Sequence, residues 1–438
     1  MKRLEDFKFV ISNWMTHKIP YVMERYIKLP ADTSMIVSVT GPRRAGKTFL
    51  LYDTILKLEK FVPVENILYI NFEHERLRNL DANDLSDIIV AYYEVSRNNK
   101  EFPVYLFLDE IQTVKDWHKW INRIYESKNF RIYISGSSSK LLSRELSTEL
   151  RGRSVDYLLL PLSFQEFLMF NKIQVDTDNI NFLIYNEKHG ELNKFLMEYI
   201  KYGGFPEVIL NPDLRDKILI SYIQTIIIKD VGERFKIEPS VLSNFFDYAI
   251  NLYSKYISGG KIYNYLKTLN YKISREFPLN LIEYFKEVFA LFEVEINSRS
   301  FKSGKQSPRK LYIVDSGIIY MKNSKLEYGR LMENCIFLEL YRRSVATTKF
   351  KINYWKEYGK SDGKEVDFVL KYMDGSRELI NVTYAMSHDD IKPRGIDSLF
   401  KAEKDLGISR LTVITWDYFE KGKINFIPLW YWLVNYKY

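Results

Sequence analysis

Residues 34–48 read SMIVSVTGPRRAGKT, a short run of apolar and β-branched residues followed directly by a loop bounded by glycines. Residues 41–48 fit the pattern G-x-x-x-x-G-K-[S/T], and the helical stretch FLLYDTILKLEK follows at residues 49–60. A strand, a loop of this pattern and a helix in succession predict a site for phosphate groups. The candidate ligand-binding residues are Gly41, Pro42, Arg43, Arg44, Ala45, Gly46, Lys47 and Thr48.

The residue types of this loop suit that chemistry. Gly41 and Gly46 allow backbone turns that direct N–H groups at phosphate oxygens, and the next helix adds its N-terminal donors. We expect Lys47 to reach the β- and γ-phosphates and Thr48 to offer its hydroxyl to Mg²⁺. The alternative is a chance glycine-rich turn, which the flanking strand and helix disfavour. The sequence therefore predicts ATP or ADP with Mg²⁺ as ligands.

A second motif follows at residues 104–110, which read VYLFLDE. The apolar run predicts a buried strand that ends in two acids. We expect Asp109 to hold Mg²⁺ and Glu110 to polarise the attacking water as a base. An acidic pair after a strand is often only a solvated loop. The phosphate loop earlier in the chain favours the catalytic interpretation.

Two further segments leave alternatives open. Residues 135–139, SGSSS, follow another apolar run, and one serine here could orient water or merely cap a helix. Arg151 and Arg153 precede the run LLLPLSFQEF. Either could reach a neighbouring subunit's γ-phosphate, although a surface arginine is the simpler interpretation of each.

The chain divides into four predicted parts. Apolar runs at residues 34–40, 67–72, 104–108 and 130–134 alternate with helical segments, which predicts a parallel α/β sheet over residues 1–160 with a helical lead-in. Helical periodicity then predicts a helical part over 161–235. Helices followed by a two-stranded ribbon predict a winged helix-turn-helix over 236–325. Residues 326–438 predict a mixed α/β module.

Composition limits the class of protein. The 438 residues are 46% hydrophobic and 27% charged, which is typical of globular domains. The single cysteine, Cys335, excludes an intramolecular disulfide and suits a reducing compartment. No apolar run reaches the roughly 18 residues that span a bilayer, and the N-terminus has no signal-peptide core. We expect a cytoplasmic protein without a membrane segment.

Together these motifs resemble a known family, the archaeal and bacterial ATPases of the AAA+ superfamily that carry an appended nuclease-like C-terminal domain. The matching segments are GPRRAGKT (41–48), YINFE (69–73), LFLDEIQ (106–112), SGSSSKLL (135–142), LRGRS (150–154), PLSFQEF (161–167) and GGFPE (203–207). The resemblance implies a P-loop core, a helical lid, a winged helix and a domain like the PD-(D/E)xK nucleases. It also implies Ser137 as the sensor residue and Arg153 as the arginine finger.

The nuclease chemistry needs two acids for a metal and a lysine that helps to activate water. Glu365 and Asp367 supply the first part, but Asn381 stands where the second acid belongs and Thr383 where the lysine belongs. Glu333 on the preceding helix is a further candidate carboxylate, although a glutamate on a helix is usually solvated. Lys371 or Lys392 could replace the lysine. We expect an inactive domain that docks a protein or nucleic acid.

The net charge of +8, with a pI of about 9.0, favours polyanion partners. DNA contact through the winged helix and a role as a protein interface remain equal alternatives. The leading interpretation of the whole chain is an ATPase cycle, which Glu110 favours; the alternatives are a nucleotide-gated switch with little turnover and a DNA-binding regulator. A homo-oligomer is a further possibility. The cations that could neutralise phosphates are Lys255, Lys261, Lys267, Lys272, Arg275, Lys302, Lys305, Arg309 and Lys310.

Overall fold

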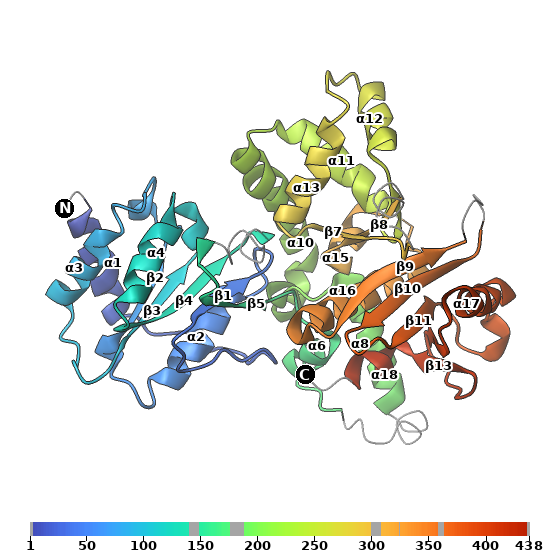
Figure 1. The fold of residues 1–438 in the computed structure, drawn as a ribbon, viewed down its shortest axis with the longest axis horizontal. Helices are drawn as coiled ribbons and strands as arrows, with labels where there is room; N and C mark the ends of the chain where they lie inside the picture. The colour runs from blue at the N-terminus through green and yellow to red at the C-terminus, as the bar shows by residue number, and fades with distance from the viewer. Residues whose placement is uncertain are drawn as a thin grey trace. The chain divides into compact units, whose positions relative to one another are not determined.

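The computed structural model describes residues 3–139, 149–175, 188–298, 308–323, 325–357 and 363–435. The chain forms two compact units (Figure 1). The first comprises Met1–Leu160 with the short segment Glu287–Phe289. The second comprises Pro161–Lys286 and Ala290–Tyr438.

The first unit is built on a parallel sheet with strand order β2-β3-β4-β1-β5. The central strands β1 and β3 are buried along their whole length, because helices cover both faces of the sheet. Its elements are α1 (Leu4–Met15), β1 (Ile36–Thr40), α2 (Lys47–Leu58), β2 (Ile67–Asn71), α3 (Ser86–Val95), β3 (Val104–Asp109), α4 (Trp117–Glu126), β4 (Phe130–Gly136) and β5 (Ser154–Leu158).

The predicted parallel sheet is confirmed, and its four predicted strands lie within one or two residues of the expected ranges. Strand β5 was not predicted. It is an edge strand whose residues are mostly half-buried or exposed, so it lacks the continuous apolar run of a central strand. The N-terminal lead-in is helical only as far as Met15.

The second unit begins with helices and continues into a three-stranded antiparallel sheet, in which β8 lies between β6 and β7. Helix α10 passes into a π-helical stretch at Ile226–Glu233. The elements are α6 (Phe164–Phe170), α8 (Lys188–Tyr202), α9 (Pro206–Leu210), α10 (Arg215–Thr225), α11 (Pro239–Asn251), β6 (Lys255–Ile257), α12 (Gly259–Thr268), α13 (Phe277–Glu287), β7 (Leu291–Val294), β8 (Arg309–Ile313) and α15 (Ser316–Lys322).

A mixed five-stranded sheet, in the order β13-β12-β11-β10-β9, completes the second unit. Strands β9, β10 and β11 are antiparallel, whereas β11, β12 and β13 are parallel. Strand β13 and helix α17 were not predicted. The elements are α16 (Tyr328–Thr347), β9 (Phe350–Lys356), β10 (Glu365–Tyr372), β11 (Arg377–Val382), α17 (Pro393–Leu406), β12 (Arg410–Thr415), β13 (Ile424–Pro428) and α18 (Leu429–Val434).

The described part of the chain contains no helix that is long and apolar enough to cross a membrane.

Candidate active site

The loop between β1 and α2 requires both of its glycines. Gly41 has φ +150°, and a Cβ there would lie 2.0 Å from the backbone oxygen of Leu159. Gly46, at the N-cap of α2, has φ +99°, which L side chains rarely adopt. The loop is therefore shaped by residues without side chains, and its N–H groups lead into the N-terminus of α2.

Lys47 lies across this loop. Its Nζ donates to the carbonyl oxygens of Gly41 and Pro42, each at 3.2 Å. The same atom lies 3.4 Å from Oε1 of Glu110, at the end of β3. The lysine of the first motif and the second acid of the other motif thus form a buried ion pair, although 63 positions separate them in sequence.

Asp109 is fully buried and accepts hydrogen bonds from three hydroxyls. Thr48 Oγ1 donates to its Oδ2 at 2.6 Å, and Tyr69 Oη donates to the same oxygen at 2.7 Å. Ser135 Oγ donates to Oδ1. Burial raises the pKa of Asp109 above its ordinary value, an effect that the Glu110 charge strengthens and the three hydroxyls only partly oppose.

Glu110 adopts left-handed backbone angles, with φ 54° and ψ 40°. This conformation is uncommon for a residue with a side chain and is typical of functional sites. Burial disfavours the charged form, but the Lys47 ammonium and the hydrogen bond from Gln112 outweigh it, so the pKa of Glu110 is lowered. The side chain is therefore a carboxylate at neutral pH.

The residues at the start of α2 and the end of β3 fit a magnesium ion bound with a nucleotide. Thr48 and Asp109 bring a hydroxyl and a carboxylate into direct contact, and oxygen ligands are those that Mg²⁺ prefers. Among the described residues, no cluster of three His, Cys, Asp or Glu side chains could hold a metal alone.

Ser137 is buried beside the acidic pair. Its Oγ accepts a hydrogen bond from Gln112 Nε2 at 3.3 Å, and Gln112 also donates to Glu110. Gln112 thus links Ser137 to Glu110. Nothing in the sequence singled out Gln112 for this position except its place two residues after the acid pair.

Arg153 lies at the other end of the sheet. It immediately precedes β5, whose first residue pairs with Ile36 at the start of β1, whereas the phosphate loop follows the end of β1. Its guanidinium donates to Glu126 Oε1 at 3.2 Å and lies over the ring of Tyr125 at 5.0 Å. Arg151 lies 3.7 Å from the same Glu126 oxygen. Neither arginine contacts the phosphate loop of its own chain.

Two arginines support the phosphate loop through contacts that the sequence motifs did not predict. Arg25 is buried and donates to the carbonyl oxygens of Ala45 at 2.8 Å and Leu160 at 2.9 Å. Arg43, within the loop, forms an ion pair with Glu73 at 2.7 Å. Arg25 lies in an irregular stretch before β1, where no periodic pattern marks it.

The carboxylates of the C-terminal module surround a lysine. Lys310 Nζ lies 3.0 Å from Glu333, 2.6 Å from Glu365 and 2.9 Å from Asp367. We call these four residues the lysine–carboxylate cluster. Burial alone would lower the pKa of Lys310, but the acids, with Asp367 foremost, raise it well above its usual range.

This cluster corrects two expectations. Lys310 was expected to be a surface cation of the wing, yet only 2% of its side chain is exposed. Glu333 was expected to be solvated, yet it is buried, and burial raises its pKa to about 8. The lysine comes from β8 rather than from the sequence neighbours Lys371 and Lys392. Strand β8 lies beside α16, where Asn334 hydrogen-bonds to both backbone groups of Ile313.

Asn381 has a structural position in this site. Its Oδ1 accepts a hydrogen bond from the Asp367 backbone at 3.0 Å, and its Nδ2 donates to the Gly395 carbonyl at 2.9 Å. Asn381, Thr383 and Lys392 line a cavity of about 340 Å³ together with Glu365 and Asp367. Both polar atoms of the Asn381 side-chain amide are therefore hydrogen-bonded to backbone groups.

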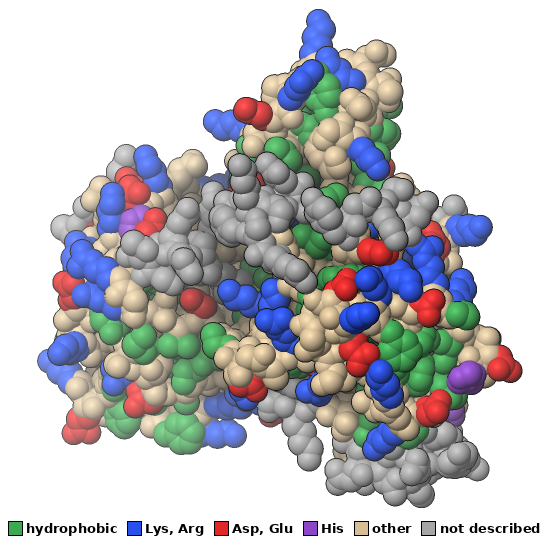
Figure 2. Space-filling model, turned by 45° about the vertical axis from the view of Figure 1, so that its right-hand side comes forward, with side chains coloured by type: hydrophobic (Ala, Val, Ile, Leu, Met, Phe, Trp, Pro, Cys, Tyr) green, Lys and Arg blue, Asp and Glu red, His purple; other side chains and the backbone are tan. Residues whose placement is uncertain are grey.

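Exposed cations remain on α12, on β6 before it and in the segment after it. Lys and Arg side chains gather on the lobe at the top of Figure 2, which contains α12. Arg309 instead pairs with Glu293 at 2.8 Å, and Lys302 and Lys305 lie outside the described residues. The exposed candidates are Lys255, Lys261, Lys267, Lys272 and Arg275.

Residues 33–168 match a family described as "AAA domain". Residues 193–326 and 328–432 match two families described as domains of unknown function, DUF8612 and DUF4143.

Among curated proteins, "Uncharacterized protein MJ1544" of Methanocaldococcus jannaschii is 37% identical, over 99% of this chain and 96% of its own length. An "Uncharacterized protein" of Haemophilus influenzae is 29% identical, over 92% of this chain and 95% of its own.

Among solved structures, Aeropyrum pernix ORC1 in complex with DNA matches 77% of this chain and 93% of its own, at 13% identity and a TM-score of 0.35. AMPPCP-bound DnaA from Aquifex aeolicus matches 64% of this chain and 86% of its own, at 13% identity and a TM-score of 0.23. Such low scores do not establish a shared overall fold.

Proposed function

The chain belongs to the family of AAA-domain proteins that includes M. jannaschii MJ1544, and we propose that it binds ATP with Mg²⁺ and hydrolyses it to drive a conformational cycle. One observation carries the proposal. Lys47, Thr48, Asp109 and Glu110, from two separate motifs, meet at the carboxyl edge of one parallel sheet. Ligands of open α/β sheets bind at this edge.

Each residue has a role that follows from its position. The loop N–H groups and Lys47 hold the phosphates, while Thr48 and Asp109 hold the metal. Mg²⁺ bound there would neutralise charge on the phosphate oxygens. Glu110, a carboxylate at neutral pH, accepts a proton from the attacking water, and Ser137, through Gln112, positions that carboxylate.

A nucleotide-gated switch with little turnover is the second candidate. It is favoured by the contacts of Glu110, whose carboxylate is bound by both Lys47 and Gln112. In that arrangement Lys47 and Gln112 bind the carboxylate that would act as the catalytic base. Hydrolysis then requires Lys47 to release Glu110 and bind the phosphates. Slow release of this contact would yield a switch rather than a continuous ATPase.

We further propose a four-part organisation: an ATPase core to residue 160, a helical lid, a winged helix and a nuclease-like domain from 326. The order α11-β6-α12-α13-β7-β8, with β8 central, supports the winged helix. Exposed cations on α12 and beside it suit contact with duplex DNA. We place the protein in the cytoplasm, since its one cysteine is buried and free.

The test is steady-state ATP turnover and equilibrium ATP binding by the full chain, with and without duplex and single-stranded DNA, beside mass measurement. Lys47→Ala should abolish tight ATP binding, because it removes the cation that spans the loop. Lys57→Ala, on the same helix and paired with Asp53, is the matched control. Unchanged ATP affinity in Lys47→Ala would refute the site. ATP hydrolysis that stops after a single round would favour the nucleotide-gated switch over the continuous ATPase.

A further inference from the structure

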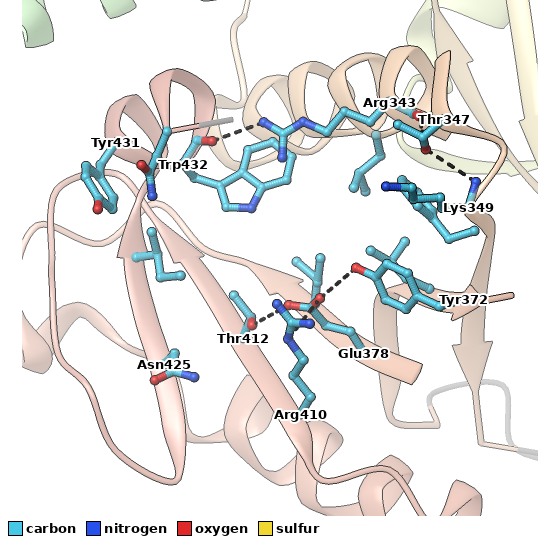
Figure 3. Close-up of a pocket in the computed structure, with 16 residues that line it drawn as sticks. Arg343, Thr347, Lys349, Tyr372, Glu378, Arg410, Thr412, Asn425, Tyr431 and Trp432 are labelled. Carbon is cyan, nitrogen blue, oxygen red and sulfur yellow. Dashed lines mark hydrogen bonds and ion pairs between the residues drawn. The ribbon is translucent and has the colours of Figure 1, made fainter. Parts of the chain in front are cut away.

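The C-terminal module contains a second cavity, on the face of its sheet opposite α17. The cavity measures about 440 Å³, within the range of small-molecule sites. Its floor is formed by side chains from alternate positions of the strands, and α16 and α18 close it from above (Figure 3). The polar and aromatic residues that line it include Arg343, Lys349, Tyr372, Glu378, Arg410, Thr412, Tyr431 and Trp432.

The one carboxylate that lines the cavity already has partners. Glu378 is buried; its Oε1 accepts from Thr412 Oγ1 at 2.8 Å, and its Oε2 accepts from Tyr372 Oη at 3.1 Å. The guanidinium of Arg410 lies 3.3 Å from Oε2. Glu378 therefore does not require a cationic ligand, and it holds Arg410 at the floor of the cavity (Figure 3).

Positive charge exceeds negative charge around the cavity. Arg343, Lys349 and Arg410 line it beside the carboxylate of Glu378. Arg410 pairs with Glu378, and Arg343 pairs with the buried Glu339 at 2.8 Å, which leaves an excess of one positive charge, that of Lys349. Lys349 is exposed, and its ammonium makes no ion pair with any residue of the described ranges. A cavity of this charge attracts an anion.

The walls suit a planar group. The Arg343 guanidinium lies 4.2 Å from the ring centre of Trp432 and donates to the Trp432 carbonyl at 3.1 Å, so it is held over the indole. Tyr372 and Phe350 pack together at 5.3 Å on another side. Aromatic rings and guanidinium planes are the surfaces on which nucleobases stack.

We propose that this cavity binds a nucleoside phosphate, free or as the terminal nucleotide of a single strand. The base stacks on the aromatic and guanidinium surfaces, and the phosphate pairs with Lys349 and Arg410. This site is separate from the phosphate loop and does not depend on the ATPase proposal.

The experiment is calorimetric titration of the full chain with AMP, which lacks the β-phosphate that the loop Lys47 is proposed to hold. We expect AMP to bind the wild type, and to bind Lys47→Ala with the same affinity. Lys349→Ala and Arg410→Ala should each weaken binding about tenfold, the effect of one lost charge-assisted hydrogen bond. Lys351→Ala, exposed and two residues from Lys349 but outside the cavity, is the matched control and should bind as the wild type does.

Adenosine and inorganic phosphate, titrated separately, should each bind more weakly than AMP. A trinucleotide with a 5′-phosphate and the same trinucleotide without it are also titrated. If the phosphorylated trinucleotide binds more tightly than AMP, the ligand is the end of a single strand rather than a free nucleotide. The proposal is overturned if AMP does not bind, or if it binds equally well to wild type, Lys349→Ala and Arg410→Ala. Loss of AMP binding in Lys47→Ala alone would assign it to the phosphate loop and also overturn the proposal.

Discussion

Lys310 Nζ lies 2.9 Å from Asp367 Oδ1, so a lysine from the small antiparallel sheet forms a buried ion pair with an acid of the C-terminal sheet. Glu333 and Glu365 complete its surroundings at 3.0 and 2.6 Å. The ammonium supplies the positive charge that these carboxylates need in a buried site. The cluster therefore joins β8, α16 and β10 through a single side chain.

Lys310→Met should destabilise the protein by about 3–5 kcal/mol, because it leaves the half-buried Asp367 and Glu365 and the buried Glu333 without their cation. Urea unfolding followed by far-UV circular dichroism measures the change. Lys371→Met, on β10 between Lys351 and Arg377, is the control and should cost nothing, since like charges lie on both sides of it. Equal unfolding midpoints for both variants would contradict the assigned role of Lys310.

The wild-type chain should not cleave DNA. Lys310 already occupies the space among the three carboxylates, and Asn381, bound to two backbone groups, replaces the second acid. An amide binds Mg²⁺ more weakly than a carboxylate because it carries no net charge. Supercoiled plasmid incubated with the protein and Mg²⁺ or Mn²⁺ provides the assay, beside Asp367→Ala. Nicking by the wild type that disappears in Asp367→Ala would prove this prediction wrong.

Glu110→Gln should retain ATP binding and lose hydrolysis, because an amide cannot accept the proton of the attacking water. Single-turnover hydrolysis and equilibrium binding measure the two effects separately. The control is Glu73→Gln, which alters the ion pair with Arg43 but not the acid pair at β3. Wild-type turnover in Glu110→Gln would remove Glu110 from the mechanism.

Arg153→Ala should lower turnover by about 10³-fold if Arg153 reaches the nucleotide of a neighbouring chain. Within one chain it lies at the opposite end of β1 from the phosphate loop, so turnover per chain should rise with protein concentration as chains associate. Arg151→Ala, which removes the other arginine near Glu126, is the control. A monomer with full activity would contradict this prediction.

The free energy of unfolding should depend on pH through the buried carboxyl group of Asp315. Its carboxylate accepts from the Gly204 and Gly317 N–H groups at 2.7 and 2.8 Å, but burial dominates and raises its pKa to about 7 from a usual 3.8. Between these values the folded state holds a proton that the unfolded state has released. This group's contribution to the free energy of unfolding should therefore fall as pH rises from about 4 to 7.

Asp315→Asn removes that titration, so the difference in unfolding free energy between wild type and variant should change across this pH range and level off above it. Urea titrations at several pH values measure the difference. The exposed Asp213→Asn is the control and should run parallel to the wild type. A pH-independent difference for Asp315→Asn would show that its pKa is not raised.

The features predicted correctly from the sequence are those that short, continuous segments of the chain determine. The apolar runs that became β1 and β3 are buried on both faces, and the two motifs that follow them meet because both strands are parallel. Strand β5 escaped prediction because it is an edge strand with half-exposed positions. Lys310 and Glu333 were misjudged because their burial depends on pairing between segments far apart in the chain, which residue type does not reveal.

Strand β4 separates β1 from β3, so the backbones of the strands that carry the phosphate loop and the acidic pair are two interstrand spacings apart, about 9–10 Å. That interval is fixed by a strand that contributes only Ser135 to Asp109, while its Tyr133 stacks on Phe107 at 4.4 Å. Backbone hydrogen bonds set that spacing, so a bulge in β4 would shift the phosphate loop relative to the acidic pair without changing a residue of either. Such a bulge should behave as a catalytic defect with intact motifs.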